Sequence, residues 1–383
     1  MIGLKTGMGH IIIEKCQGAQ NSDMRSHALS VNQIKTRYIK VDPVHPDEDA
    51  INEAGLILRS GGLVAFPTET VYGLGADATN GRAVARLFQA KGRPPDNPII
   101  VHVASRSQLR SLAADIPGKA VLLMDAFWPG PLTLILPALR EVPGEVTAGL
   151  PTVAVRMPDH PVALAFIKAA GVPVAAPSAN LSGRPSPTRA EHVIQDLDGR
   201  IEAVLDGGPA GIGVESTVLD LTSRIPVILR PGGITLEELE ACLGEVAVDP
   251  DAAAGFYEGD SPRSPGMKYI HYAPRAPLLL VTGSPAAAAQ KIMELALEEK
   301  SCGRRAGILA YAESSDYSDV GEVVIAGSRD RPETVAAALY SALRRFDELG
   351  VDIILAEGLE EKGVGQAVMN RLKKAAGGRI IQG

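Results

Sequence analysis

Hydrophobic and polar residues alternate in blocks along most of the chain, and the blocks predict alternating strands and helices. Apolar runs of strand length include Leu63–Phe66 and Ile99–Val103, and each is followed by proline or polar residues. Stretches with helical spacing lie between such runs, beginning near Asp47, where the first turn is acidic and Gly61–Gly62 marks the end. Over residues 37–245 this alternation predicts an α/β layer fold.

Three of the predicted helices have recognisable capping residues. Asn80 is a suitable N-cap for the short helix that follows it. Thr188 with Glu191, and Thr235 with Glu238, have the spacing of a capping box, in which side chain and backbone at a helix start bond to each other. We therefore expect helices to begin at these three places.

Prolines constrain how the predicted strands pair. A proline cannot donate a hydrogen bond to a neighbouring strand, so it is excluded from central ladder positions. We therefore expect a twisted, mixed sheet with polar loops meeting at one side, rather than a regular doubly wound sheet. The prolines in or beside strands are Pro67, Pro137, Pro158 and Pro177.

Residues 246–274 interrupt the pattern and predict a linker, because Gly, Pro, Asp and Ser dominate them. The end of this linker carries Lys268, Tyr269, His271 and Tyr272, which a passive spacer does not need. Our interpretation is a linker that docks on a site as a lid; simple packing between domains is the alternative.

The remaining segments complete the domain organisation. Residues 275–383 repeat the strand–helix alternation and predict a small Rossmann-like three-layer α/β domain, without the glycine fingerprint of dinucleotide binding. Residues 1–36 have no sustained pattern and predict a flexible extension. A start at Met24 is the alternative for this segment.

Composition and charge are those of an ordinary globular protein. Hydrophobic residues make up 45% and charged residues 22%, and the net charge of −7 argues against general coating of nucleic acid. No apolar run approaches the roughly 18 residues of a membrane span, and no secretion signal is evident. The cysteines, Cys16, Cys242 and Cys302, lie far apart. We therefore expect a cytoplasmic protein without a cysteine metal site.

Positive charge gathers in one segment of this acidic chain. From Arg82 to Arg110, six Lys or Arg residues accompany a single acid, Asp96. This excess suggests a bound anion, with a solvated surface as the alternative. No Walker P-loop, zinc-binding H-E-x-x-H or G-x-S-x-G motif occurs, so those chemistries are not indicated.

Polar loops offer further groups for anions. The proline-stiffened stretch over residues 176–188 carries Ser178, Asn180 and Ser186, whose donors suit phosphate oxygens, although turn formation is the alternative. Glu215 and Ser216 lie in an otherwise apolar stretch, where buried polar groups require partners.

Two arginines end apolar strands. Arg156 follows an Ala-Val run and Arg230 follows a Val-Ile-Leu run. A guanidinium group can make forked bonds to a carboxylate or a phosphate, and structural ion pairs are the alternative for both residues.

Seven of these stretches, in this order, resemble the YrdC-like domain. The linker sequence PGMKYIHYAP and the second α/β domain resemble the longer, two-domain threonylcarbamoyl-AMP synthases, so the resemblance extends over all but the first 36 or so residues. The seven stretches are PTETVYGLG (67–75), KGRPPDNPIIVHV (91–103), WPGPLTLIL (128–136), TVAVRMPDHP (152–161), APSANLSGRPSPT (176–188), GVESTVLD (213–220) and ILRPGGIT (228–235).

The resemblance implies a nucleotidyltransferase, an L-threonylcarbamoyladenylate synthase. Such an enzyme converts L-threonine, bicarbonate or CO2, and ATP with Mg²⁺ into threonylcarbamoyl-AMP and pyrophosphate. A TsaD-type tRNA threonylcarbamoyltransferase would then use the adenylate to form N6-threonylcarbamoyladenosine at position 37 of tRNAs that read ANN codons. Direct contact with tRNA or double-stranded RNA is a further expectation, and Mg²⁺ is expected to bind mainly through ATP phosphates.

The resemblance also assigns site residues where the motifs match. Phosphate-binding and catalytic roles are implied for Lys91, Arg93, Ser178 and Asn180. Arg93 and Ser178 are also implied ATP contacts, together with Asn97, Thr152, Ser186, Arg230 and the linker residue Tyr269. The threonine pocket is implied to comprise Thr70, His102, Arg156, Ala176 and Ser216.

Two rival hypotheses belong to other classes. A non-catalytic module could bind double-stranded RNA through the basic segment at residues 82–110, but the matched threonine pocket speaks against it. A carbamoyl-transfer enzyme of hydrogenase maturation contains a similar domain. That family adds Cys-rich zinc modules, which three scattered cysteines do not provide.

Overall fold

The computed structural model describes residues 34–254 and 272–383. The predicted N-terminal extension lies almost entirely outside these residues, and so do residues 255–271 of the predicted linker, with Tyr269. Residues 246–254 of that linker form strand β11 (Ala247–Val248) and helix α8 (Pro250–Ala254). Of the four functional side chains at its end, only Tyr272 can be placed.

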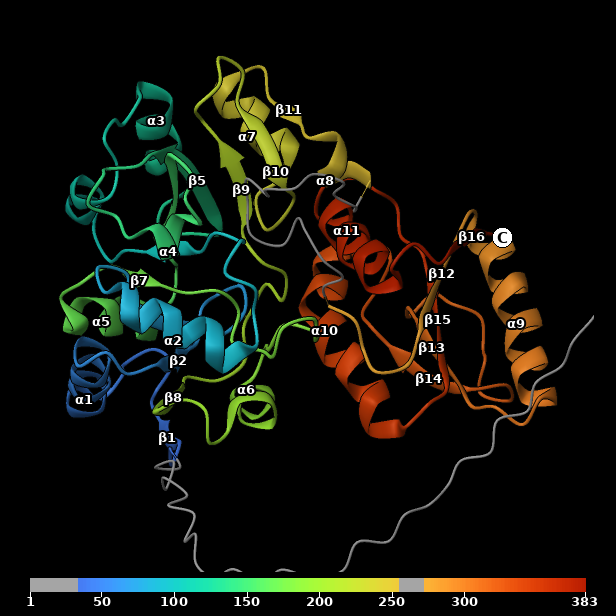
Figure 1. Cartoon of the computed structure of the whole chain (residues 1–383). Helices are drawn as coiled ribbons and strands as arrows, with labels where there is room; N and C mark the ends of the chain where they lie inside the picture. Colours follow the sequence, from blue (N-terminus) through green and yellow to red (C-terminus); the bar gives the residue numbers. More distant parts are fainter. Residues whose placement is uncertain (1–33, 255–271) are drawn as a thin grey trace, which may run out of the picture. The chain divides into compact units, whose positions relative to one another are not determined.

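The predicted mixed sheet is confirmed in the first part of the described chain (Figure 1). Eleven strands follow the order β1-β8-β2-β3-β7-β4-β6-β5-β9-β10-β11 among the described residues. The sheet contains parallel pairs such as β5 with β9 and antiparallel pairs such as β5 with β6. The strands are β1 (Arg37–Lys40), β2 (Val64–Phe66), β3 (Gly73–Asp77), β4 (Ile100–His102), β5 (Leu132–Pro137), β6 (Thr152–Arg156), β7 (Val174–Ala175), β8 (Ala203–Asp206), β9 (Thr217–Asp220), β10 (Val227–Arg230) and β11 (Ala247–Val248).

Helices connect these strands, and two of the three predicted caps are confirmed. The Asn80 side chain accepts bonds at the start of α2, and Thr235 and Glu238 form a capping box on α7. The helices are α1 (Glu48–Arg59), α2 (Gly81–Lys91), α3 (Gly118–Phe127), α4 (Gly144–Thr147), α5 (Pro161–Ala170), α6 (Ala190–Leu197), α7 (Leu236–Leu243) and α8 (Pro250–Ala254), with a 3₁₀ turn at Arg106–Ser111.

The capping box predicted at Thr188 is wrong. Helix α6 begins after Arg189, without a side-chain cap. The Thr188 hydroxyl instead lies 3.0 Å from the hydroxyl of Ser341, and the Thr188 amide donates to His192 Nδ1. A distant partner therefore replaces the local bond that the spacing predicted.

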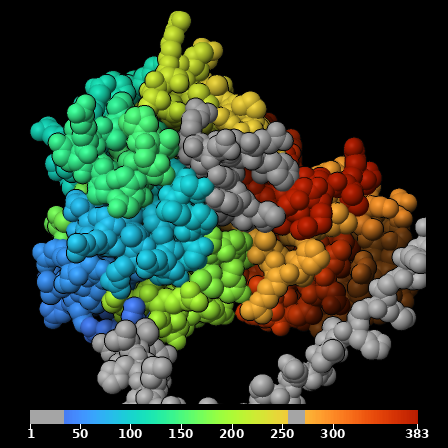
Figure 2. Space-filling model, in the orientation of Figure 1, coloured from blue at the N-terminus to red at the C-terminus, as the bar shows by residue number. Residues whose placement is uncertain are grey.

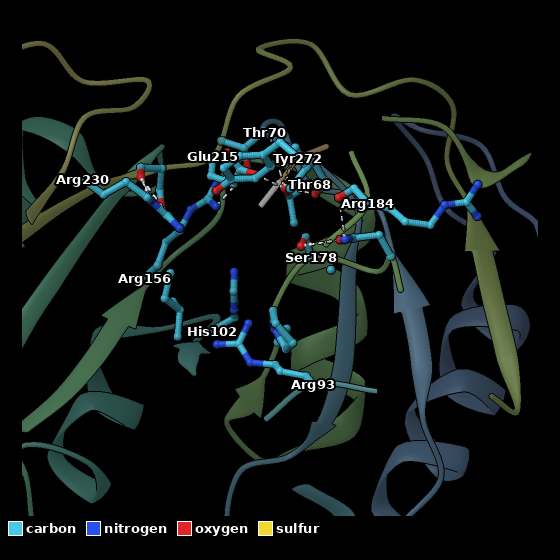
Figure 3. Close-up of a pocket in the computed structure, with 17 residues that line it drawn as sticks. Thr68, Thr70, Arg93, His102, Arg156, Ser178, Arg184, Glu215, Arg230 and Tyr272 are labelled. Carbon is cyan, nitrogen blue, oxygen red and sulfur yellow. Dashed lines mark hydrogen bonds between the residues drawn. The ribbon is translucent and has the colours of Figure 1, made fainter. Parts of the chain in front are cut away.

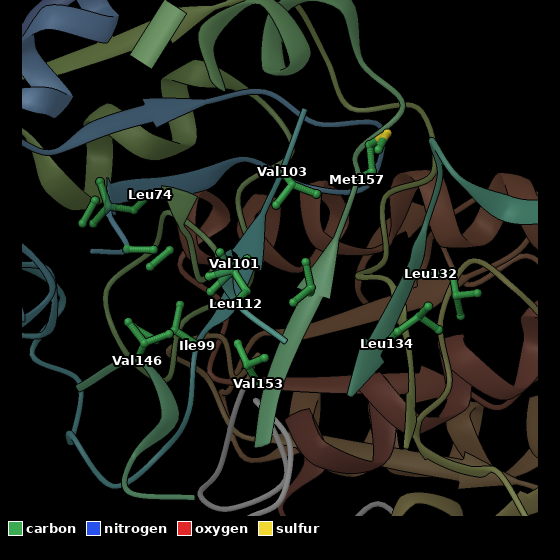
Figure 4. Close-up of a cluster of buried hydrophobic side chains, with 14 of the residues drawn as sticks. Leu74, Ile99, Val101, Val103, Leu112, Leu132, Leu134, Val146, Val153 and Met157 are labelled. Carbon is green, nitrogen blue, oxygen red and sulfur yellow. The ribbon is translucent and has the colours of Figure 1, made fainter. Parts of the chain in front are cut away.

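Helices cover both faces of the first sheet at its central strands, which explains why strands such as β2 and β4 are buried throughout. Alternate residues of β2 face opposite ways: Val64 and Phe66 join a core with α1 and α5, and Ala65 joins the core beneath α2 and α3. Figure 4 shows buried side chains of the core beneath α2 and α3, including Leu74, Val101 and Leu134. Burying one such leucine or valine contributes about 1.5–3 kcal/mol.

The C-terminal part is a parallel three-layer unit, as predicted. Its five described strands follow the order β14-β13-β15-β12-β16 and pair in parallel. Helix α9 packs on one face, while α10 and α11 cover the other. Its elements are β12 (Leu278–Thr282), α9 (Pro285–Ser301), β13 (Ala306–Ala310), β14 (Glu322–Ile325), α10 (Pro332–Leu349), β15 (Ile353–Glu357), α11 (Val364–Ala376) and β16 (Ile380–Gln382).

Two details modify the predicted layout. Strand β16 completes the second sheet, and the sequence pattern did not predict it. Strand β11 pairs with β10, so the first sheet continues past the boundary predicted at residue 245.

In the space-filling view of Figure 2 the elements of the C-terminal part, coloured orange to red, form one continuous body. Within the described ranges, no helix is both long and apolar enough to cross a membrane.

Candidate active site

Loops at the ends of several strands of the first sheet enclose a polar pocket. Its volume is about 650 Å³, counting the space open to solvent. Figure 3 shows charged and hydroxyl side chains from separate elements directed into it. Nine residues that the sequence predicted for the site line this pocket, namely Thr70, Arg93, His102, Arg156, Ala176, Ser178, Asn180, Ser216 and Arg230.

Four other predicted residues are not in the pocket wall. Lys91 and Asn97 are buried beside it, and Thr152 is half-buried at the start of β6. Ser186 is also buried, and its hydroxyl donates to Glu215, which does line the pocket. Tyr269 lies outside the described residues.

Lys91 shapes the loop that carries Ser178 and Asn180. Its ammonium group donates to the backbone carbonyls of both residues. The Ser178 hydroxyl donates to Asn180 Oδ1 at 2.6 Å, and the Asn180 amide group donates to carbonyls at Leu181 and Arg184. Burial, followed by the nearby Arg93 charge, lowers the pKa of Lys91. Lys91 therefore holds this loop from behind, while the hydroxyl of Ser178 faces the pocket.

Arg93 is fixed against the same wall. Its guanidinium group donates to the carbonyls of Asn97 and Pro98, at 3.2 and 3.0 Å, and lies 5.9 Å from the centre of the Phe88 ring. These contacts hold the planar cation in one orientation at the pocket, where it could make forked bonds to an anion.

Arg156 is an almost fully buried cation in the pocket lining. Its guanidinium group donates to the Thr70 hydroxyl at 2.9 Å and to the Gly130 carbonyl at 3.2 Å, and it forms an ion pair with Glu69 at 2.5 Å. The hydroxyls of Thr68 and Thr70 lie 2.8 Å apart. A fixed cation beside two hydroxyls can bind a small molecule that carries a carboxylate and polar groups.

His102 is neutral at physiological pH. It is buried at the end of β4 and meets the Phe66 ring edge to face, with 6.0 Å between ring centres. Burial and, to a smaller degree, the Arg156 charge lower the pKa of His102 to about 3. A neutral imidazole beside Arg156 adds a polar group without adding positive charge.

Ser216 and Arg230 close the pocket beside β9. Arg230 donates to the Ser216 carbonyl at 2.9 Å and to its hydroxyl at 3.1 Å. The Ser216 hydroxyl also lies 2.8 Å from that of Thr133 on β5. These bonds fix the segment in which the sequence predicted buried polar groups.

Glu215 has the partners that its burial requires, and two of them come from the C-terminal part. Arg371 donates to one carboxylate oxygen at 2.7 Å, and the Tyr340 hydroxyl donates to the carboxylate at 2.8 Å. Burial alone would raise the pKa of Glu215, but the charges of Arg371 and Arg230 and the Ser186 bond outweigh it and lower the value to about 2. Glu215 is therefore a carboxylate anion at the pocket wall.

Sequence reasoning assigned no role in the site to several residues that line the pocket. Thr68 and Arg184 lie within the matched motifs, which could have indicated them. Tyr272 was expected only as part of the docking linker, without a role of its own. Glu215 was singled out only as a buried group that needs partners. Its partners Tyr340 and Arg371 carry no local sequence signal.

The basic segment at residues 82–110 does not form one anion site. Of its six cations, only Arg93 lines the pocket. Arg86 pairs with Glu202, and Arg106 pairs with Asp125 on the surface. Within residues 34–254 and 272–383, no group of three or more His, Cys, Asp or Glu side chains could hold a metal ion.

Comparisons with known proteins agree with this architecture. A family model described as telomere recombination, of the Sua5/YciO/YrdC type, matches residues 56–232. A second model, described as the C-terminal domain of threonylcarbamoyl-AMP synthase, matches residues 234–377. The two models together therefore cover both described parts of the chain.

Full-length relatives match as well. The threonylcarbamoyl-AMP synthase of Bacillus subtilis is 55% identical over 342 residues, which are 89% of this chain and 97% of the relative. The Pyrococcus abyssi protein of the same name is 53% identical, over 88% of this chain and 96% of that protein. A crystal structure of P. abyssi Sua5 complexed with L-threonine superimposes with a TM-score of 0.86 and 51% identity, over 91% of this chain and all of that one. The chain thus belongs to the threonylcarbamoyl-AMP synthase family, enzymes of the nucleotidyltransferase type.

Proposed function

We propose that this protein makes L-threonylcarbamoyl-AMP and pyrophosphate from L-threonine, bicarbonate or CO2, and ATP. The observation that carries the proposal is one pocket whose lining includes Arg93, Ser178, Arg156 and Thr70. Two anionic substrates must approach each other in this reaction, so fixed cations and hydroxyl donors on both sides are the groups it needs.

The proposed threonine end is the part of the pocket around Arg156. Arg156 would hold the threonine carboxylate, because its guanidinium group is already oriented by Thr70 and Gly130. His102, Ser216 and the Ala176 backbone would complete the surroundings of the amino acid. The related P. abyssi Sua5, crystallised in complex with L-threonine, supports the choice of substrate.

The ATP end lies along the loop with Ser178 and Asn180. Arg93 would face the phosphates, while Lys91 would fix the loop through its two carbonyl bonds. The remaining ATP contacts that we propose are Asn97, Thr152, Ser186, Arg230 and Tyr269. Mg²⁺ would enter with ATP, bound to its phosphates, and would add positive charge there.

The chemistry proceeds by positioning rather than through a covalent enzyme intermediate. The amine of threonine attacks the carbon of CO2 derived from bicarbonate and, after losing a proton, gives an N-carboxylate. An oxygen of this carboxylate attacks the α-phosphorus of ATP, and the bond to pyrophosphate breaks. Arg93 would stabilise the charge that develops on the phosphates.

The product is a mixed anhydride, so a second enzyme must consume it. We propose a TsaD-type transferase that forms N6-threonylcarbamoyladenosine at position 37 of tRNAs reading ANN codons, with both enzymes in the cytoplasm. Double-stranded RNA or tRNA could contact this protein directly during that transfer.

Incubation with ATP, L-threonine and ¹⁴C-bicarbonate tests the proposal. We expect pyrophosphate release that depends on threonine, and a labelled product with the mass of threonylcarbamoyl-AMP. Reactions without threonine, or with D-threonine, are the controls. Pyrophosphate release that is equal with and without threonine, and no labelled adenylate, would contradict the assignment.

A further inference from the structure

The C-terminal part of the chain contributes side chains to the environment of the pocket. Arg371 on α11 and Tyr340 on α10 both bond to Glu215, which lies in the pocket wall of the first part. Both side chains are fully buried. Nothing in the proposed chemistry assigns a task to either.

Arg371 is a fully buried cation whose contacts converge on this wall. It donates to the Glu215 carboxylate at 2.7 Å and to the carbonyl of Pro231 at 3.0 Å. Pro231 immediately follows Arg230 in the chain. Because an unpaired buried charge is costly, Glu215 and Arg371 hold each other in place. The segments before β9 and after β10 are thereby tied to α11.

Tyr340 contacts two residues that line the pocket, Glu215 and Tyr272. Its hydroxyl donates to both oxygens of Glu215, at 3.0 and 2.8 Å. Its ring stacks on Tyr272, which lines the pocket, with 5.3 Å between ring centres. Arg371 lies over the Tyr272 ring as well, 5.5 Å from its centre.

Tyr272 and Ser186 show why these contacts bear on the reaction. Tyr272 is buried and has a positive φ of 65°, a backbone conformation that is unfavourable for a residue with a side chain and therefore depends on its surroundings. Ser186, a proposed ATP contact, donates to the same Glu215 carboxylate at 2.6 Å. One carboxylate thus links α10 and α11 to both proposed substrate positions, since Ser216 follows it directly.

We propose that Arg371 and Tyr340 are positioning residues of the reaction: they hold the Glu215 carboxylate and the Tyr272 ring, and through them the two substrate positions. The C-terminal domain is then a structural component of the active site. This inference rests on the proposed function, since it concerns the same pocket.

Replacing Arg371 tests the proposal by steady-state kinetics. In Arg371→Met we expect kcat/KM to fall about ten- to hundred-fold, as when the partner of a site residue is removed. The KM for threonine and the KM for ATP should both rise, because Ser216 and Ser186 lose their fixed positions. A mere loss of folded enzyme would lower the apparent kcat and leave both KM values unchanged.

Arg344→Met is the matched control. Arg344 on α10 is also a buried arginine, and it bonds to Asp196 and to the Pro185 carbonyl of the first part. Neither partner lines the pocket; Asp196 also pairs with Arg184, a pocket residue to which the proposed function gives no task. We expect this variant to lose thermal stability while both KM values stay within about two-fold. Arg371→Lys, which keeps the charge but not the fork, should lie between wild type and Arg371→Met.

A more conservative pair serves if Arg371→Met does not fold. Tyr340→Phe and Ser341→Ala each remove one hydroxyl from adjacent residues of α10. The first hydroxyl bonds to Glu215 and the second to Thr188. Only Tyr340→Phe should raise the KM values.

Amide hydrogen exchange measures how firmly the segment around Glu215 is held, and it does not require an active enzyme. Peptides covering residues 213–217 should exchange faster in Arg371→Met than in Arg344→Met. A wild-type enzyme that releases no pyrophosphate would refute the proposed function, and the exchange difference would still decide the positioning claim. Unchanged KM values in Arg371→Met or Tyr340→Phe, together with unchanged amide hydrogen exchange at residues 213–217, would overturn the proposal that Arg371 and Tyr340 are positioning residues.

Discussion

Arg156 ends β6 with its guanidinium nitrogens directed at three groups: the Thr70 hydroxyl, the Gly130 carbonyl and the Glu69 carboxylate. A lysine ammonium is a single point charge on a flexible stem and cannot reproduce this fork. The orientation of the cation, rather than its charge alone, is what a bound carboxylate would meet.

Arg156→Lys should therefore impair threonine recognition selectively. We expect the KM for threonine to rise by about one to two orders of magnitude, with the KM for ATP within about two-fold, because the fork bonds to a carboxylate are lost. Initial-rate measurements with each substrate varied will show this split. Arg106→Lys, at an exposed ion pair with Asp125, is the control and should match wild type. Equal increases in both KM values would contradict the assignment of Arg156.

His102 gives a prediction about acid stability. Burial, assisted by Arg156, lowers the pKa of His102 to about 3, whereas a histidine in the unfolded chain has an ordinary pKa of about 6.5. Between these values the unfolded chain binds a proton that the folded protein does not, so this group makes stability fall as pH falls. His102→Gln removes the effect.

Thermal melts at pH 7 and pH 5 will test it. The loss of Tm between the two pH values should be smaller in His102→Gln than in wild type. His192, with a pKa lowered to about 4 by burial and by Arg344, acts in the same direction and remains in both proteins. Parallel curves of Tm against pH would show that His102 takes up its proton while folded.

At the scale of elements, the sequence correctly predicted the strand ends and helix caps that depend on residues close together in the chain. Strands β6 and β10 end at Arg156 and Arg230, as the apolar runs indicated, and Asn80 caps α2. Thr188 failed as a cap because its hydroxyl meets Ser341, 153 positions along the chain. No pattern of neighbouring residues contains such a contact.

The same reason explains what the sequence missed in the site. The resemblance supplied the residues of the motifs, and the pocket brings most of them together. Arg371 is 156 positions from Glu215 in the chain, in a helix whose pattern is that of an ordinary amphipathic helix. Its role depends on how the two parts pack, and single-sequence patterns do not carry that information.

The loop before β9 depends on a close approach to α10. Gly213 has a φ of +80°, and a Cβ there would lie 2.3 Å from the Ala336 carbonyl oxygen. Gly213→Ala should therefore destabilise the protein by about 1–3 kcal/mol, through backbone strain and overlap. Gly211→Ala is the control, because the nearest atom to its Cβ, the Glu69 carbonyl oxygen, is 3.9 Å away. Denaturant unfolding will compare the free energies of unfolding of the two variants. Equal values would show that α10 moves to accommodate the added methyl group.

At the scale of the whole molecule, the two described parts have separate sheets but share an apolar cluster. Val71 and Val214 of the first part pack with Leu339 and other residues of the C-terminal part. The other clusters of the first sheet are built from residues before 255. The first part can therefore retain its own core when the rest is removed, while its pocket wall loses support.

A chain truncated after residue 254 should fold but lose activity. We expect a cooperative thermal transition, because the cores beneath α1 and α2 remain. We expect kcat/KM to fall at least about ten-fold, because Glu215 loses both Arg371 and Tyr340. Circular dichroism and the pyrophosphate assay will measure the two effects. A truncated chain with wild-type kcat/KM would exclude any contribution of the C-terminal domain or linker to the reaction.

The ion pair between Arg156 and Glu69 has a consequence for selectivity. The Arg156 guanidinium group already has a negative neighbour in Glu69, so a simple anion such as sulfate or lactate would gain attraction from one and repulsion from the other. A zwitterion brings its own positive charge, whose attraction to the Glu69 carboxylate would offset that repulsion. The pair would therefore weaken the binding of simple inorganic and organic anions more than that of zwitterions.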